Sequence, residues 1–292
     1  MKKIKKTELR LFIGIMATMI VIASCSETSS ADGNLPTKDV LFSVQTELDV
    51  QPFTRAGIGN DKVTSLLIID KCDGVAKTLT KSSSDADFAA PKLTLTYGTH
   101  ELTFVTHKDD GLTYNEDSHK LVFSGVNDNL FIKTVSLTVD KNTTAQSVTL
   151  TRKVAQARVK ILDAIPAGLK KVTLKFGAYY REYSISSGFG ITSTVETKEY
   201  TGWTAGKVNE EVYANTLVPS ADFKTDLTIT FLATDDAVIR QVVQKDVPLY
   251  ENRKTTVSGH FFTHGDTFSV TVDNEWGEDV VVEWSDAQSA SE

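Results

Sequence analysis

Apolar residues in this chain alternate with polar ones or occur in short runs between turn residues, and this pattern limits the fold more than any other feature. An alternating pattern places every second side chain on one face of an extended strand, whereas a helix needs apolar residues three and four positions apart. Beyond residue 38, no convincing helical pattern extends over ten or more residues. The sequence therefore predicts an all-β protein, and strands this short and closely spaced are typical of β-sandwiches.

The predicted strands form two series that meet at 151–153, where no Pro or Gly marks a flexible linker. We therefore expect an N-terminal β-sandwich at 39–153 and a C-terminal β-sandwich at 154–284 that abut with little freedom, followed by a disordered tail at 285–292. The first series comprises 40–50, 63–70, 92–97, 100–107, 120–123, 131–139 and 145–150. The second comprises 154–162, 171–176, 181–185, 208–218, 226–233, 238–243, 253–262, 267–273 and 279–284.

Residues 1–24 have the form of an export signal. Five basic residues within the first ten positions precede an uncharged stretch at 11–23. As a helix these thirteen residues would rise about 20 Å, which is short of the roughly 30 Å hydrocarbon core of a membrane. The segment is therefore expected to be cleaved rather than kept as a membrane anchor.

The residues Ile22, Ala23, Ser24 and Cys25 have the form of a lipobox, in which the thiol accepts a lipid before the peptidase cuts. We expect the mature chain to begin at Cys25 and to be held in a membrane by its acyl chains, palmitate among them. The alternative is an ordinary signal peptide with an incidental cysteine. The polar residues up to position 38 complete a flexible tether at 25–38.

Charge and cysteine content exclude several classes of partner and chemistry. Without residues 1–24 the chain keeps 26 basic and 37 acidic residues, a formal charge of −11, which makes nucleic acid an unsuitable partner. Cys72 is then the one thiol besides Cys25, and we expect it to be a small buried apolar residue.

No pattern of residues indicates catalysis, a metal site or a cofactor. The sequence lacks a nucleophile elbow, a phosphate-binding loop and a zinc-binding His pair. His260 and His264 would lie about 13 Å apart on one face of a strand, which is too far to share a metal ion. The aromatic residues Tyr179, Tyr180 and Trp203, together with Tyr200, would suit a sugar-stacking platform, but packing in a sandwich core is the favoured interpretation.

Several motifs, taken in their order and spacing, resemble the fimbrillin family, the subunits of type V pili, which includes the major fimbrillin and the anchor and tip proteins. The motifs are LTRKVAQARVKI from Leu150, FTRA from Phe53, TLVP from Thr216, LYENRKTTVSGHFF from Leu249 and FSVTVDNEW from Phe268, so the similarity spans nearly the whole mature chain. The resemblance implies two tandem transthyretin-like β-sandwich domains, delivered as a lipoprotein to the cell outer membrane. It also implies assembly by strand exchange, in which a protease cuts after an arginine and the first strand of a subunit is replaced by a strand from the next subunit.

Mapped onto this chain, the strand at 40–50 is the candidate for displacement, with Val40, Phe42 and Val44 on one face. Arg55 is the candidate cleavage site, because two glycines and an asparagine follow it and predict an accessible loop. The alternative is that Arg55 is an ordinary solvated loop residue.

The candidate donor strand is the C-terminal hairpin at 267–284. Its apolar residues alternate along both halves, so that each half presents one apolar face to a groove. A plain terminal hairpin that closes its own sandwich remains the alternative. The residues concerned are Phe268, Val270, Val272, Val280, Val282 and Trp284.

The sequence thus predicts a non-enzymatic structural subunit of a surface fimbria that contributes to cell adhesion. Its expected partners are other pilus subunits through β-strand exchange, the outer membrane through the lipid, and a receptor on a host or bacterial surface. The alternative function is that of a surface glycan-binding lipoprotein in a polysaccharide uptake system.

Overall fold

The computed structural model describes residues 35–47, 63–108, 111–126, 130–263, 268–273 and 281–282. Of residues 281 and 282 only the backbone is described. Within these residues all regular secondary structure is β and there is no helix, which confirms the all-β prediction. Among them, accordingly, there is no helix long and apolar enough to span a membrane. Cys25, the signal sequence and most of the tether lie outside the described residues.

Eighteen strands make up the described chain. Those of the N-terminal half are β1 (Thr37–Thr46), β2 (Ser65–Cys72), β3 (Val75–Ser82), β4 (Lys92–Thr96), β5 (Gly98–His107), β6 (Leu112–Asn115), β7 (Lys120–Phe123), β8 (Phe131–Val139) and β9 (Gln146–Arg152). Those of the C-terminal half are β10 (Val154–Ile161), β11 (Leu169–Ser184), β12 (Phe189–Thr201), β13 (Glu210–Leu217), β14 (Lys224–Ala233), β15 (Val238–Pro248), β16 (Lys254–Gly259), β17 (Phe268–Val272) and β18 (Val281–Val282).

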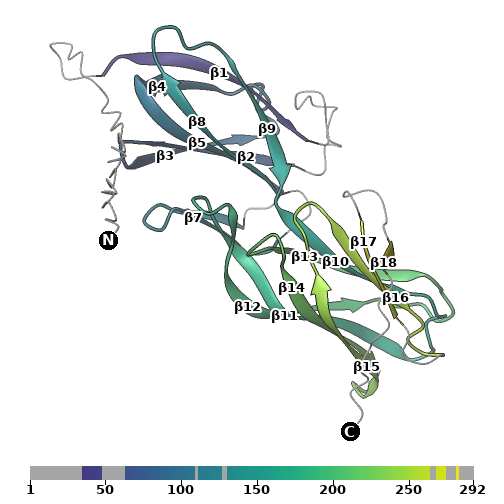
Figure 1. Ribbon diagram of the computed structural model, residues 1–292. Coiled ribbons are helices and arrows are strands. Elements are labelled where there is room, and N and C mark those ends of the chain that lie inside the picture. Colours follow the sequence, from purple (N-terminus) through teal and green to yellow (C-terminus); the bar gives the residue numbers. More distant parts are fainter. Residues whose placement is uncertain are drawn as a thin grey trace, which may run out of the picture.

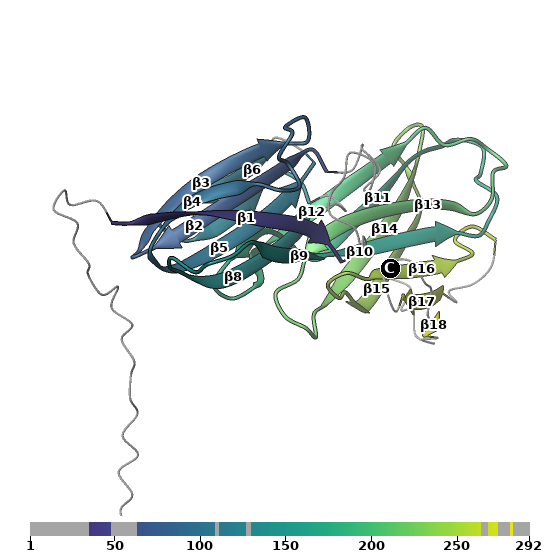
Figure 2. The same ribbon diagram turned by 90° about the horizontal axis from the view of Figure 1, so that it is seen from above.

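The N-terminal half is built around one seven-stranded sheet, in the order β3-β2-β5-β8-β9-β1-β4. The sheet curls, as Figures 1 and 2 show, so that β1 and β4 lie over one face of the remaining strands. A single apolar cluster fills the space between them, with Leu66, Ile68, Leu102 and Phe104 fully buried in it. Alternation predicts this face, because these four residues occupy alternate positions on β2 and β5.

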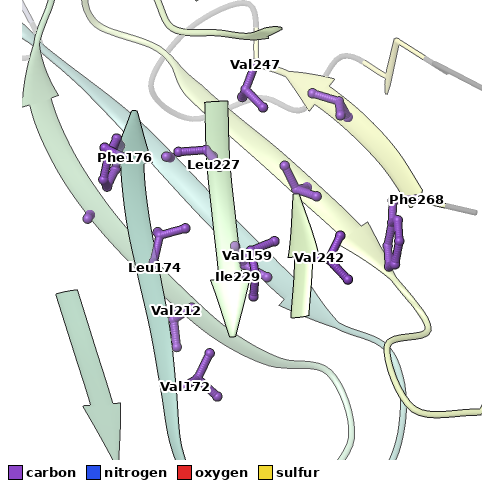
Figure 3. Packing of buried hydrophobic residues seen from close by; sticks show 14 of the residues in the cluster. Val159, Val172, Leu174, Phe176, Val212, Leu227, Ile229, Val242, Val247 and Phe268 are labelled. Carbon is purple, nitrogen blue, oxygen red and sulfur yellow. The ribbon is translucent and has the colours of Figure 1, made fainter. Parts of the chain in front are cut away.

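The C-terminal half packs two sheets against each other. One has the order β13-β10-β16-β17-β18 and the other the order β15-β14-β11-β7-β6, with β12 paired along β11. Figure 3 shows the apolar side chains that converge between them, among them Val159 from β10, Leu174 from β11 and Ile229 from β14, all fully buried. The two halves thus each bury a large apolar cluster of their own.

The hairpin of β6 and β7 joins the two halves. It lies in the sequence between β5 and β8, where only the strand at 120–123 is predicted, as part of the N-terminal sandwich. Instead β7 pairs with β11 of the other half, with Leu121 opposite Tyr183. A third apolar cluster covers this junction and includes Ile69, Leu121 and Tyr183. Because backbone pairing and a buried cluster both cross the junction, the two halves are firmly joined.

Glycine is required where β12 passes the end of β13. The Gly190 N–H donates to the carbonyl of Val218 at 2.7 Å. A Cβ atom at position 190 would lie 3.0 Å from the Cβ of Leu217 and 3.1 Å from that of Tyr180. A side chain therefore cannot be added here without moving one of these strands.

We expect Gly190→Ala to lower the free energy of unfolding by about 1–2 kcal/mol, because it overpacks a closely fitted strand crossing. The measurement is urea unfolding followed by circular dichroism. Gly125→Ala is the matched control, since a Cβ there meets no atom of the described residues within 4 Å, and its effect should stay within about 0.5 kcal/mol. Equal effects of the two substitutions would contradict the close packing at Gly190.

Candidate assembly site

The predicted displaced strand lies in the N-terminal half as β1, held by backbone hydrogen bonds along both of its edges. Residues 37–41 pair antiparallel with β4, and residues 42–46 pair parallel with β9. In the segment that precedes β4, the carbonyls of Pro91 and Ala89 accept from the N–H groups of Phe42 and Val44, at 3.0 and 2.9 Å. Removal of β1 would therefore leave unpaired backbone groups on two strands, which is the condition for another strand to add.

The apolar face of β1 fills the core of the N-terminal half. Val40, Phe42 and Val44 have at most 1% of their surface exposed. The ring of Phe42 lies against Phe104 of β5, with 5.3 Å between the ring centroids. Each such side chain contributes about 1.5–3 kcal/mol through burial, so β1 is an integral part of this core and its loss would open an apolar groove.

The outer face of β1 is tied down by exposed polar contacts. Asp39 accepts from Lys92 Nζ at 2.9 Å and from Thr94 Oγ1 at 2.7 Å. The Lys92 hydrogen bond is the main reason that the pKa of Asp39 is lowered. Leu41 on the same face is 48% exposed. Because exposed ion pairs contribute little, the apolar face and the backbone pairing provide most of the binding of β1.

The segment that follows β1 carries the candidate cleavage site. Arg55 lies at a position outside the described residues, which end here at Glu47 and resume at Val63. The Glu47 N–H donates to the carbonyl of Leu150, and its side-chain Oε1 accepts from the N–H of Arg152, both at 2.9 Å. The end of β1 is thus fixed against β9, and cleavage at Arg55 stays a prediction.

The first half of the candidate donor hairpin is β17, which pairs antiparallel with β16 of its own chain. Phe268, Val270 and Val272 are buried, and Phe268 stacks on Phe261 at 4.7 Å between centroids. The backbone of Val282 pairs with that of Val270. Val280 and Trp284 lie outside the described residues, so the donor role of the hairpin stays a prediction.

The aromatic residues weighed as a sugar-stacking platform pack against the C-terminal core. Tyr179 is 1% exposed and meets Phe176 edge-on at 5.6 Å, while the ring of Tyr180 meets Phe223 at 5.4 Å. Adjacent residues of a regular strand point to opposite faces, but the register of β11 shifts between Phe176 and Tyr179. The favoured interpretation of core packing is confirmed for Tyr179, and Tyr180 is half-buried beside it.

Trp203 and Tyr200 are half-buried and are fixed by hydrogen bonds to backbone carbonyls. The Trp203 indole N–H donates to the carbonyl of Tyr200 at 3.0 Å, and the Tyr200 hydroxyl donates to the carbonyl of Tyr213 at 2.6 Å. Burial raises the pKa of Tyr200 to about 12, so the hydroxyl stays protonated as this hydrogen bond requires. These contacts are those of packing residues.

The described part of the chain holds no group of three or more His, Cys, Asp or Glu side chains that would bind a metal ion. His100 and His119 are buried, and each contacts a carboxylate: His100 Nδ1 lies 2.6 Å from Asp70, and His119 Nε2 lies 2.9 Å from Glu101.

Cys72 is half-buried at the end of β2 rather than fully buried, because that strand end is partly exposed. The sequence predicts a buried Cys72, and the structure shows it only partly buried.

Comparison with known proteins gives a family and a fold. Residues 85–290 match the model of a family described as a family of unknown function, DUF6562. No curated protein matches the chain. A polysaccharide-binding candidate of the DUF1812 family from Bacteroides thetaiotaomicron VPI-5482 superposes with a TM-score of 0.58 at 10% identity, covering 84% of this chain and 98% of that one.

Two further solved structures are candidate adhesins from Bacteroides. The one from Bacteroides thetaiotaomicron VPI-5482 has a TM-score of 0.53 at 12% identity and covers 86% of this chain and 99% of its own. The one from Bacteroides ovatus has a TM-score of 0.52 at 14% identity and covers 88% and 98%. At such identities the likeness establishes a shared fold.

Proposed function

Because the chain belongs to the DUF6562 family, whose function is unknown, we propose a function from its own residues. The protein is a surface fimbrial subunit assembled by strand exchange. The observation that carries the proposal is β1. This ten-residue strand fills the core with Val40, Phe42 and Val44 and is bound by backbone pairing on both edges. A cut in the segment after it would turn an internal strand into a separate, exchangeable peptide.

Strand exchange of this kind leads directly to a fibre. A groove emptied of β1 offers unpaired backbone groups and apolar pockets, which a strand of a second copy can fill by β-augmentation. Because the groove and the donor strand lie on different parts of the subunit, the contact is head-to-tail and the assembly stays open. No catalytic residue and no cofactor takes part in this function.

The donor that suits this proposal best is the final part of the chain, from Val280 to Trp284. Phe268 on β17 is 4% exposed and belongs to the C-terminal core, so donating β17 would remove part of that core. Val280, Val282 and Trp284 alternate in the same way as Val40, Phe42 and Val44. They are the residues that we propose enter the groove.

Export and anchoring complete the proposal. Lipid attached to Cys25 would hold the precursor on the cell outer membrane, with the body exposed at the surface for adhesion. The adhesin names of two proteins with this fold are consistent with such a role.

The test is limited digestion of the purified protein with an arginine-specific protease. We expect one cut after Arg55, identified by mass spectrometry of the new amino terminus, followed by multimers that appear as a ladder on a gel without boiling and vanish on heating. Arg55→Ala is the matched control, because it removes the cleavage site and leaves β1 unchanged. A protein that is not cut at Arg55, or that is cut there and stays monomeric, would rule out assembly by this route.

A second candidate function is glycan binding by a surface lipoprotein of a polysaccharide uptake system. The observation that favours it is the fold shared with a protein named as polysaccharide-binding. The packed aromatic residues at 179, 180, 200 and 203 do not support it, so it needs a binding site elsewhere on the molecule.

A further inference from the structure

A cleft of about 560 Å³ lies between the sheet of the N-terminal half and the β6–β7 hairpin. Its floor comes from β2, β3 and the end of β5, and its wall comes from β6. Figure 1 shows the hairpin, near the β7 label, below the sheet that carries β2 and β3. Clefts of about 300–1,000 Å³ are the size that binds small molecules in proteins.

The floor of the cleft is a row of small polar side chains beside an apolar strip. Ala76, Thr78 and Thr80 occupy alternate positions on β3 and therefore share one face. Ser65 and Leu67 do the same on the adjacent strand β2, where Leu67 pairs directly with Thr80. Thr78 and Thr80 are exposed to solvent, so their hydroxyl groups are accessible.

The wall is fixed in place by contacts on either side of the cleft. The hydroxyl of Tyr114 on β6 lies 2.8 Å from His119 Nδ1, and His119 Nε2 lies 2.9 Å from Glu101 of β5. The Oε1 atom of Glu116 accepts from the N–H of Ala76 at 3.4 Å. The hairpin is therefore tied to the floor by contacts to both β3 and β5, and the cleft is formed before any ligand binds.

The chemistry of the lining selects a neutral ligand rich in hydroxyl groups. Of the ten described residues that line the cleft, seven carry hydrogen-bonding side chains, four of them Ser or Thr and the others His107, Tyr114 and Glu116. Among the described residues that line the cleft there is no Lys or Arg, so a phosphate or carboxylate ligand would find no permanently charged partner and would be repelled by the carboxylate of Glu116. Hydroxyl groups both donate and accept, as do those of a sugar, and Glu116 adds a further acceptor.

The apolar lining completes the match with a sugar ring. Leu67, Ala76 and Leu112 supply C–H surface beside the hydroxyl groups, and a saccharide likewise presents C–H faces between its hydroxyls. Burial and the nearby carboxylates of Glu116 and Glu101 raise the pKa of Tyr114, so its phenol remains a neutral hydroxyl at physiological pH. From this lining we propose that the cleft between β2, β3 and β6 binds a neutral saccharide of one or two rings.

The site gives the second candidate function a location and a class of ligand, and it does not depend on strand exchange. It lies on the opposite face of the N-terminal sheet from the core that β1 fills, since Leu67 belongs to the junction cluster and Leu66 to the β1 cluster. A strand that replaced β1 would therefore fill the core on the other face of this sheet and would not occupy the cleft.

The test is saturation-transfer difference NMR of the purified protein with four neutral disaccharides, namely maltose, cellobiose, lactose and chitobiose. We expect at least one of them to receive saturation, and Thr78→Trp to weaken its binding at least tenfold by filling the cleft. Thr78 is an exposed strand residue, a position where Trp is well tolerated. Ser136→Trp on β8, exposed and outside the lining, is the matched control and should bind as the parent does.

Glu116→Gln provides a second variant that leaves the volume of the cleft unchanged. It should bind the disaccharide more weakly, because a carboxylate acceptor is replaced by a weaker amide. Absence of saturation with all four disaccharides, or binding that is unchanged in Thr78→Trp, would overturn the proposal. Digestion at Arg55 and multimer formation should be the same in Thr78→Trp as in the parent, so a failure of this site is distinguished from a failure of strand exchange.

Discussion

Phe42→Ala is expected to lower the free energy of unfolding by about 3–5 kcal/mol, the cost of removing a fully buried aromatic side chain from a packed core. Phe42 has no exposed surface and contacts Phe104 on the opposite side of the core. The surrounding strands are joined by backbone pairing on both sides of β1. The cavity therefore cannot collapse easily, and the loss should lie in the upper part of the range for large-to-small substitutions.

The measurement is urea unfolding followed by circular dichroism, with Leu41→Ala as the matched control on the same strand. Leu41 is 48% exposed and points away from the core, so its truncation should change the free energy by less than about 1 kcal/mol. Similar losses for the two variants would contradict the assignment of Phe42 to the core. The same result would also count against assembly by strand exchange, because the groove left by β1 would then lack an apolar pocket at the position of Phe42.

The parts of the fold that the sequence predicts well are those in which alternation and burial agree. Val40, Phe42 and Val44 were expected on one face of a strand, and all three are buried on one face of β1. The strands β3, β6 and β12 were not predicted. β6 has only four residues, and the exposed positions of β3 and β12 carry Thr, Lys and Glu and few large apolar residues. Edge strands of this kind gain their stability from a neighbouring strand, which a local pattern does not reveal.

The length of β11 is a second feature that the alternation of apolar residues does not predict. Two strands were expected at 171–176 and 181–185, but one strand runs from Leu169 to Ser184 through Gly177. Its register shifts between Phe176 and Tyr179, and such an irregularity inverts the alternation on which the prediction depends. Beyond it, Glu182, Tyr183 and Ser184 pair with β7, a contact between distant parts of the sequence.

The candidate cleft likewise could not be predicted from the sequence. Its lining combines Thr78 on a strand that was not predicted, Ser65 on β2 and Tyr114 on β6. Only the pairing of β7 with β11 places the hairpin over this face of the sheet. Serine and threonine residues at intervals along a chain carry no signal of their own, whereas a strand with three large apolar residues, such as β1, does.

A second large effect is expected at Asp163, a carboxylate buried in the loop after β10. It accepts hydrogen bonds from the N–H of Phe262 at 3.0 Å, from Nδ1 of His260 at 3.2 Å and from the hydroxyl of Thr263. Burial acts to raise its pKa, but the hydrogen bonds from Thr263, Phe262 and His260 outweigh that effect, and the pKa is lowered. Asp163 thereby holds the loop after β16 against the C-terminal core, where Phe261 is 1% exposed.

Asp163→Ala should lower the free energy of unfolding by about 3–5 kcal/mol, because several donors lose a charged acceptor at once. Asp235→Ala is the matched control, since Asp235 is exposed and accepts one hydrogen bond from Ala237 within its own turn, and its effect should stay below about 1 kcal/mol. Urea unfolding at neutral pH measures both. Equal losses would show that the contacts of Asp163 do not hold the loop.

The pH dependence of stability tests the same contacts independently of the alanine variant. Because the pKa of Asp163 is lower in the folded protein than its ordinary value of 3.8, its contribution is fully present above that value and is lost as the pH falls through the folded pKa. Asp163→Asn cannot titrate, so the difference in unfolding free energy between parent and variant should shrink as the pH is lowered below 3.8. A difference that stays constant from neutral to acidic pH would mean that the charge of Asp163 contributes nothing to holding the loop after β16.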